Sequence, residues 1–242
     1  MATAKILVVD DDPAIQNLIV RFLSNKKDYQ VESAINGKTA IEIFETLDPD
    51  LVILDLNLPD THGRNLCKEM QERTGVFVLV LTSSTDTAEK ITLLGEGADD
   101  YVTKPFDLQE LEYRVAAILR RLRDKTNPTK PELEFGNLTI CPERREVKVG
   151  ESQINLTALE FDILHFMAQF PGRVLRRSEL IQKVWDYDYV GDQRVVDVHI
   201  GQIRKKIEVD ASQPSIIQTV RGVGYKFEVA EQSAQLADHS TN

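Results

Sequence analysis

Short apolar runs alternate with longer amphipathic stretches through the first half of the chain, and this alternation most strongly constrains the fold. The runs at 5–9, 51–54 and 76–81 are continuous, β-rich and too short for helices, which is typical of parallel strands covered on both faces. The stretch 13–23 repeats apolar residues at helical spacing. Regular alternation of strand and helix predicts an α/β doubly wound parallel sheet of about five strands, ending near residue 123.

The second half of the chain has a different order of elements. A polar segment with two prolines, DKTNPTKP, shows no apolar periodicity and predicts a linker. Beyond it, short strand-like runs come first and helices follow, and the last pattern is two β-rich runs joined by a turn at Gly222 and Gly224. We therefore predict a first domain at 1–123, a linker at 124–131, an α+β domain at 132–229 and a disordered tail at 230–242.

Composition limits the classes of protein that fit. The chain has 242 residues, 42% of them hydrophobic and 28% charged, as in ordinary globular proteins. No apolar run approaches the roughly 18 residues that span a bilayer, and the N-terminus lacks the pattern of a signal peptide. We therefore expect a cytoplasmic protein without a membrane partner. Cys67 and Cys141 match no metal-binding spacing and are expected to be reduced thiols.

Charge is unevenly distributed along the chain, whose net charge is −10. Residues 1–124 hold 14 Lys and Arg against 22 Asp and Glu, whereas residues 125–242 hold 15 against 17. An acidic chain is ordinarily a poor nucleic-acid ligand, because binding to phosphates needs local positive charge. From Arg173 to Lys206, however, there are eight basic residues against five acidic ones. This segment is a candidate contact for DNA, although a charge run by itself is usually a solvated helix face.

Three acidic side chains are expected to meet at one edge of the predicted sheet. Asp10 and Asp11 follow the first strand, and Asp55 follows the third, which is its neighbour in the flavodoxin-like strand order. Each of them taken alone is more often a turn or cap residue. Together they would repel one another, and Mg²⁺ relieves such repulsion because it takes oxygen ligands while it neutralises a phosphate.

Two further strand ends add complementary groups. Thr82 follows the fourth strand and Lys104 follows the fifth. A carboxylate beside Mg²⁺, a hydroxyl and a lysine can hold a phosphoryl group that is being transferred to that carboxylate. Positioning and charge neutralisation supply most of the catalysis of phosphoryl transfer, so this set of groups is sufficient.

The segments ILVVDDDP, DLVILDLNLPD, VLVLTS and GADDYVTKPFDLQEL, in this order, resemble the receiver domain of two-component response regulators over residues 4–123. The resemblance implies that Asp55 accepts a phosphoryl group from a sensor histidine kinase. It also implies that Mg²⁺ is held by Asp10, Asp11, Asp55 and the backbone carbonyl of Asn57. Lys104 would pair with the phosphate, and Thr82 and Tyr101 would form a switch pair. A symmetric homodimer face, formed on phosphorylation, would include Lys90, Asp99, Asp100, Glu110, Arg114 and Arg121.

One position in this half is unusual for its predicted element. Gly95 falls inside a predicted helix at 85–96, where a glycine costs about 1 kcal/mol relative to alanine. We therefore expect that helix to be loose.

The predicted helix at 192–206 has two distinct faces. Val196, Ile200, Ile203 and Ile207 follow helical spacing and should be buried. The opposite face is basic, and the helix follows another helix and precedes a hairpin that carries Arg221. This order indicates a winged helix-turn-helix that places a helix in the major groove of DNA.

The segments LTALEFDILHFMAQFPGRVLRRSELIQKVW, RVVDVHIGQIRKKIE and IIQTVRGVGYKF resemble the winged-helix domain of OmpR/PhoB-type transcription factors. The resemblance implies binding to direct repeats in promoter DNA, a loop at 186–191 available to RNA polymerase, and Arg221 in the minor groove. Gln202 departs from the basic residue often found there, and because glutamine pairs bidentately with adenine, it predicts a preference for an A·T pair. His199 is expected to contact phosphate or to pack. The candidate DNA contacts are Arg194, Val198, His199, Gln202, Arg204, Lys205, Thr219 and Arg221.

The sequence therefore predicts a transcriptional regulator controlled by phosphorylation of Asp55, rather than an enzyme. One alternative is an aspartyl-phosphate phosphatase, but that class places a second acid two residues after its nucleophile, where this chain has Asn57. The other alternative is a winged-helix transcription factor whose receiver domain only dimerises and is never phosphorylated.

Overall fold

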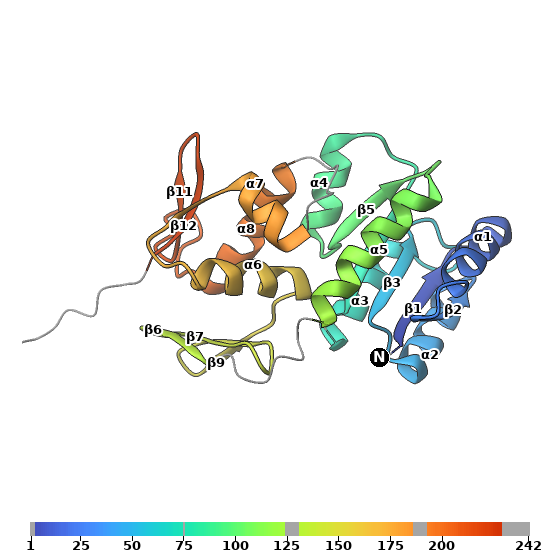
Figure 1. Ribbon diagram of the computed structural model, residues 1–242, viewed down its shortest axis with the longest axis horizontal. Helices are drawn as coiled ribbons and strands as arrows, with labels where there is room; N and C mark the ends of the chain where they lie inside the picture. The colour runs from blue at the N-terminus through green and yellow to red at the C-terminus, as the bar shows by residue number, and fades with distance from the viewer. Residues whose placement is uncertain (1–2, 75, 124–130, 186–192, 229–242) are drawn as a thin grey trace, which may run out of the picture.

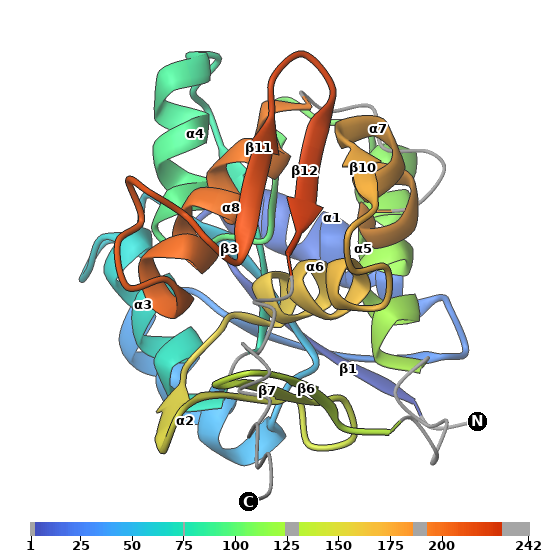
Figure 2. The same cartoon turned by 90° about the vertical axis from the view of Figure 1, so that its left-hand side faces the viewer.

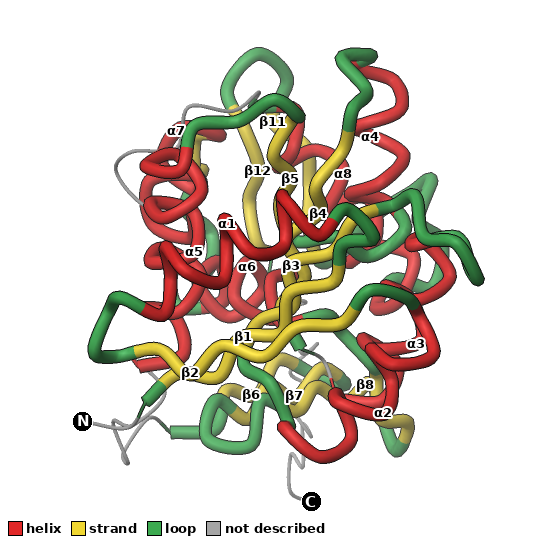
Figure 3. Tube along the Cα trace, turned by 90° about the vertical axis from the view of Figure 1, so that its right-hand side faces the viewer, coloured by secondary structure: helices red, strands yellow, loops and turns green. Residues whose placement is uncertain are grey.

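Five parallel strands form the central sheet of the N-terminal half. The computed structural model describes residues 3–74, 76–123, 131–185 and 193–228. The strands are β1 (Ala4–Val9), β2 (Tyr29–Ala34), β3 (Leu51–Asp55), β4 (Phe77–Thr82) and β5 (Asp100–Thr103), in the order β2-β1-β3-β4-β5. This order confirms the predicted doubly wound sheet, and Figure 3 shows the strands crossing the molecule side by side.

Helices cover both faces of this sheet. They are α1 (Pro13–Ser24), α2 (Gly37–Leu47), α3 (Gly63–Thr74), α4 (Thr87–Gly95) and α5 (Leu108–Arg123) (Figure 1). Alternate residues of β1 face opposite sides: Ile6 and Val8 pack in the cluster that contains Ile19 of α1, whereas Leu7 and Val9 pack in the cluster that contains Phe44 of α2. The strands are thus buried on both faces, which explains their continuous apolar sequences.

Helix α4 differs from its prediction at both ends. It spans Thr87–Gly95 rather than 85–96, so Gly95 is its last helical residue instead of an interior one. A glycine at a helix end forfeits less helix propensity than one in the interior. Glu96 is the C-cap and Gly97, with φ +120°, follows it, so Gly95 is an ordinary helical residue of the last turn; the expected looseness of the helix stays a prediction.

The C-terminal half begins with a four-stranded antiparallel sheet and continues with helices. The sheet contains β6 (Leu133–Phe135), β7 (Leu138–Cys141), β8 (Glu146–Val149) and β9 (Ser152–Ile154). Helix α6 (Ala158–Ala168) begins at a capping box, in which Thr157 and Glu160 each accept the other's backbone N–H. Helix α7 (Arg177–Leu180) runs into a turn of π-helix, η2 (Ile181–Trp185), and α8 (Arg194–Ile207) follows.

A second small sheet forms the wing. It has the order β10 (Val174–Arg176), β12 (Gly224–Phe227), β11 (Ile217–Val220), and the β11–β12 hairpin was predicted from the sequence. Gly224 is needed where β12 meets β10, because a Cβ atom there would lie 2.0 Å from the Leu175 carbonyl oxygen. These elements confirm the predicted α+β winged-helix class.

The two halves of the chain pack against each other. Helix α8 lies beside α4 in Figures 1 and 2, and the backbone N–H of Leu159 in α6 donates to Asp99 Oδ1 at 3.3 Å. One continuous apolar cluster includes Val115 of α5 and Trp185 of η2. The recognition helix expected from the sequence therefore faces the first domain.

Several predicted segments lie outside the described residues. They are most of the linker at 124–131, the loop at 186–191 and the tail at 230–242. Within the described ranges, no helix is both long and apolar enough to cross a membrane.

Candidate functional site

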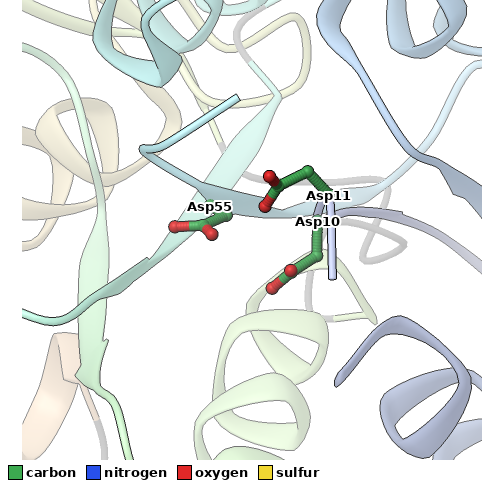
Figure 4. A group of neighbouring side chains, drawn as sticks. All are labelled: Asp10, Asp11 and Asp55. Atoms are coloured by element: carbon green, nitrogen blue, oxygen red, sulfur yellow. The ribbon is translucent and has the colours of Figure 1, made fainter. Parts of the chain in front are cut away.

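Three carboxylates gather at the carboxyl ends of adjacent strands. Asp10 follows β1, Asp55 ends β3, and Asp11 lies in the loop that leads to α1. Asp10 is fully buried and Asp55 is 5% exposed, whereas Asp11 is exposed. One carboxylate oxygen of each lies within 4.8 Å of the other two, and Figure 4 shows the three side chains together. The structure thus brings together the acids that the sequence predicted to converge.

The ammonium group of Lys104 lies between two of these acids. Its Nζ atom is 2.7 Å from Asp10 Oδ2 and 2.8 Å from Asp55 Oδ2. Burial raises the pKa of Asp10 by more than its hydrogen bonds with Lys104 and the Asp12 N–H lower it. Burial lowers the pKa of Lys104, but its hydrogen bonds and charge attraction to Asp10 and Asp55 together outweigh burial, so that pKa is raised. The protonated lysine is therefore the counter-ion of both buried acids.

The carboxylate cluster fits a hard divalent cation. Oxygen atoms from one to three carboxylates, completed by water and a carbonyl, form the kind of site that Mg²⁺ prefers. Asn57 stands beside the cluster, with its backbone N–H 3.4 Å from Asp55 Oδ1. A hollow opens at this edge and is lined by Asp11, Leu56, Asn57, Leu58, Pro59, Thr61 and His62.

Thr82 reaches the site from β4. Its side chain is buried, and its Oγ1 accepts the backbone N–H of Ser84 at 3.1 Å. A second hollow at Asn57 is lined by Thr82, Ser83, Ser84 and Glu89 as well as Leu56 and His62. Tyr101 lies on β5, partly exposed, with the Lys90 ammonium 5.2 Å from its ring centre.

His62 lines both hollows, and sequence reasoning did not identify it. It belongs to the loop between β3 and α3, where a single histidine gives no periodic signal. An isolated β-bridge between Asn57 and His62 folds that loop back over the strand end. Such a bridge joins backbone atoms, so it cannot be predicted from the residue types.

The residues expected on the dimer face make contacts inside the chain. Arg114 Nη1 is 2.7 Å from Asp100 Oδ2, and Arg114 Nη2 is 2.8 Å from Glu110 Oε1. Burial lowers the pKa of Arg114, but the neighbouring carboxylates of Asp100 and Glu110 raise it by more. The net result is a raised pKa. Asp99 is fully buried, and its Oδ2 accepts the Val78 N–H at 2.7 Å. The Arg121 side chain lies outside the described part.

Helix α8 buries the face that the sequence predicted. Val196, Ile200, Ile203 and Ile207 are all buried. Of the candidate DNA contacts, Arg194 and Lys205 are exposed, and Val198 and Gln202 are half-buried. His199 is 2% exposed and packs against Trp185, with ring centres 5.6 Å apart, so it lies in the core rather than on a surface that DNA could reach.

The other candidate contacts lie on or beside the wing. Arg221 is exposed in the turn of the β11–β12 hairpin, and Thr219 is exposed on β11. Arg204 is not free to reach a phosphate in this arrangement. Its Nε and Nη2 donate to the Ile217 carbonyl at 2.8 and 2.5 Å, and its Nη2 donates to Thr219 Oγ1 at 2.9 Å. Arg204 therefore ties α8 to the wing.

Comparison with protein families identifies both halves of the chain. Residues 6–116 match the response regulator receiver domain, and residues 150–227 match the C-terminal domain of transcriptional regulatory proteins. A curated relative, the alkaline phosphatase synthesis transcriptional regulatory protein PhoP of Bacillus subtilis, is 40% identical over 232 residues. That alignment covers 93% of this chain and 96% of PhoP.

Solved structures resemble the whole chain to different degrees. A mutant of the protein RitR, 28% identical, covers 94% of this chain and all of its own with a TM-score of 0.80. DrrB of Thermotoga maritima, described as an OmpR/PhoB homologue, is 34% identical and covers 93% of this chain and 99% of its own, yet its TM-score is 0.50.

We predict that Lys104→Met lowers the free energy of unfolding at pH 7 by about 3–5 kcal/mol, because two buried carboxylates lose their counter-ion. The deficit should shrink as the pH falls, since the raised pKa of Asp10 lets it become neutral and need no partner. Denaturant unfolding of both proteins between pH 5 and 8 measures this. Lys38→Met, at an exposed position, is the control; an equal deficit at every pH would contradict the account.

Proposed function

Since the chain belongs to the OmpR/PhoB-type response regulators, which join a receiver domain to a DNA-binding transcriptional regulatory domain, we propose that phosphorylation of Asp55 controls its promoter binding. The observation that carries the proposal is the cluster of Asp10, Asp11 and Asp55, with Lys104 bound to Asp10 and Asp55. Its partners are a sensor histidine kinase, double-stranded promoter DNA and RNA polymerase. With these partners, the proposed location is the cytoplasm.

The chain's own residues have defined roles in the proposed transfer. An oxygen of Asp55 forms a bond to phosphorus as the nitrogen–phosphorus bond of a phosphohistidine breaks, and the imidazole keeps the electron pair. Lys104 already contacts Asp55 Oδ2, so its charge is positioned to pair with an incoming phosphoryl oxygen. The Thr82 hydroxyl is the polar group of the neighbouring strand that can turn toward the same oxygens.

Magnesium is the cofactor that the cluster supports. Asp10, Asp11 and Asp55 would hold it with the carbonyl of Asn57, and it would neutralise charge on the phosphoryl group during transfer. Two roles follow for the surrounding residues. Asp10 orients the cluster through its contact with Lys104, and Asp11, being exposed, is the acid most accessible to solvent.

The phosphorylated receiver is proposed to dimerise through α4, β5 and α5. Two features support this face: β5 is an edge strand of the sheet, and Tyr113 of α5 is 65% exposed. The ion pairs of Arg114 with Asp100 and Glu110 lie on the same elements. Dimerisation would bring two winged-helix domains to adjacent half-sites.

DNA binding tests the proposed function directly. With Mg²⁺ and acetyl phosphate, the wild-type chain should bind a duplex selected from a random pool at least tenfold more tightly than without the donor, roughly the change that a population shift of 1–2 kcal/mol supplies. Asp55→Ala should show no donor effect, and fluorescence anisotropy at fixed salt measures both. Equal binding by both proteins under all conditions would instead favour a regulator that is not phosphorylated.

Dimerisation gives a separate prediction. Sedimentation velocity should show a donor-dependent dimer for wild type that is lost in Arg114→Glu and weakened in Tyr113→Ala, which leaves the ion pairs intact. Arg73→Glu is the control, because Arg73 pairs only with Glu45 and Glu69 on the surface of α2 and α3 among the ion pairs described. A full dimer in both test variants would place the interface elsewhere.

Base recognition should depend on Gln202. We expect Gln202→Ala to lose an A·T preference at one position of each half-site, a change of about 1–3 kcal/mol in discrimination. Lys205→Ala, one turn along the same face and exposed, should weaken binding to all sequences about equally. Parallel binding-site selections with the two variants measure the difference, and an unchanged preference in Gln202→Ala would contradict the assignment.

A further inference from the structure

Asp60 ties the loop that follows β3 to the start of α2. This loop, residues 56–62, leads from β3 to α3 and carries Asn57, whose carbonyl is a proposed ligand of Mg²⁺. Asp60 Oδ1 accepts the Gly37 N–H at 2.8 Å, and Asp60 Oδ2 accepts the Lys38 N–H at 2.9 Å. One side chain thus joins the loop to a helix that begins more than 20 residues earlier in the chain.

These two hydrogen bonds require a carboxylate at position 60. The first N–H groups of α2 have no partner inside the helix, and each oxygen of Asp60 accepts one of them. Hydrogen bonds to an ionised carboxylate are stronger than neutral ones, and the positive end of the helix dipole adds to them. The hydrogen bonds from Gly37 and Lys38 lower the pKa of Asp60, so it is ionised at neutral pH. Asparagine offers one acceptor oxygen and would turn its NH₂ group toward the second N–H, so it cannot replace this contact.

The loop and α2 approach too closely for a side chain at Gly37. A Cβ atom built on this buried glycine would collide with Cγ2 of Thr61 and would lie 3.3 Å from Asp60 Oδ1. The loop therefore rests directly on the backbone of α2, and its position depends on that contact.

The other residues of the loop face the carboxylate cluster. They line the hollow that also contains Asp11, and they are Leu56, Asn57, Leu58, Pro59, Thr61 and His62. Asp60 is the exception within 56–62, because its carboxylate is bonded to α2 instead. The residue that anchors the loop therefore stands outside the site whose wall the loop forms.

The base of the loop is held separately from its tip. The Gly63 N–H donates to the Leu56 carbonyl at 2.8 Å, and the β-bridge between Asn57 and His62 lies beside this bond. Both contacts join one end of the loop to the other. The bonds of Asp60 to α2 instead connect the tip to a different element of the domain.

We propose that Asp60 is a positioning residue for the metal site, because it fixes the loop 56–62 against α2 and so orients the Asn57 carbonyl toward a divalent cation. Mg²⁺ demands near-ideal octahedral geometry, so a ligand on a loosened loop holds it more weakly. Groups that orient metal ligands from behind typically contribute about 10–100-fold to metal affinity. The proposal rests on the proposed function, which assigns Mg²⁺ to this cluster.

Metal binding without phosphorylation gives the first test. Mn²⁺ takes the same oxygen ligands, and the electron paramagnetic resonance signal of the free ion measures its binding to the full chain, with Mg²⁺ as competitor. Asp60→Asn should raise the dissociation constant about tenfold, and because Asp60 is exposed, the core stays intact. Asn36→Ala is the matched control, because Asn36 Oδ1 accepts the Thr39 N–H of the same helix at 2.9 Å but belongs to the N-cap of α2. It should lower the melting temperature, as a lost cap does, and leave metal affinity unchanged.

A second variant separates loop position from helix stability. Gly37→Ala adds the Cβ atom that collides with Thr61 and so displaces the loop, although alanine favours a helix more than glycine does. It should weaken Mn²⁺ binding several-fold while Asp60 is intact. Unchanged affinity in either Asp60→Asn or Gly37→Ala, or an equal loss in Asn36→Ala, would overturn the proposal.

Further measurements distinguish this proposal from the proposed function. Asp11→Ala removes an expected ligand and should bind no Mn²⁺ at concentrations that saturate the wild-type chain. Normal binding by Asp11→Ala, or none by wild type, would overturn the assigned metal site and this proposal with it. If both behave as expected, the rate of phosphorylation by acetyl phosphate should reach the wild-type value in Asp60→Asn at saturating Mg²⁺, with about tenfold more Mg²⁺ needed for half of that rate. A lower rate at saturating Mg²⁺ with an unchanged Mg²⁺ requirement would contradict a role in positioning the metal ligand alone.

Discussion

The ion pairs of Lys104 with Asp10 and Asp55 are the interaction on which the rest of the structure depends. They hold together the ends of three strands, since Asp10 follows β1, Asp55 ends β3, and Lys104 follows β5. In a buried environment of low dielectric constant, two carboxylates without a cation would be costly. The lysine donates to both carboxylates and compensates their charge, and Asp55 is the acid that we propose attacks a phosphoryl group.

The same edge of the sheet connects to the DNA-binding half through α4. The loop after β4 begins at the buried hydroxyl of Thr82 and ends at the N-cap of α4, and the other end of that helix touches α8. One short helix therefore lies between the carboxylate cluster and the face of α8 that we propose reads DNA. A structural change at the end of β4 would therefore need to pass only through α4 to reach the contact between α4 and α8.

Much of the fold followed from the sequence, because its signals are local. Continuous apolar runs identified the strands, and the spacing of Val196, Ile200, Ile203 and Ile207 identified the buried face of α8. The carboxylate cluster was predictable because parallel strands bring their carboxyl ends to one edge. The family resemblance added roles for residues such as Asn57 and Tyr101 that spacing alone could not assign.

What the sequence did not reveal depends on contacts between distant segments. The sequence around Asp99 does not predict its hydrogen bond with Leu159, because the donor is a backbone N–H 60 residues away. His199 lies at the border of the two faces of α8, and only packing against Trp185 shows that it is buried. The packing of Gly95 against Val198 and Gln202 of α8 was also hidden, because it joins segments about 100 residues apart.

The most direct measurement is the intact mass of the chain, with peptide mapping, after exposure to acetyl phosphate in Mg²⁺ or in excess EDTA. The account predicts one added phosphoryl group, located on Asp55, in Mg²⁺ and almost none in EDTA. A phosphoryl group on a different residue, or equal labelling in EDTA, would contradict a function built on the cluster of Asp10, Asp11 and Asp55.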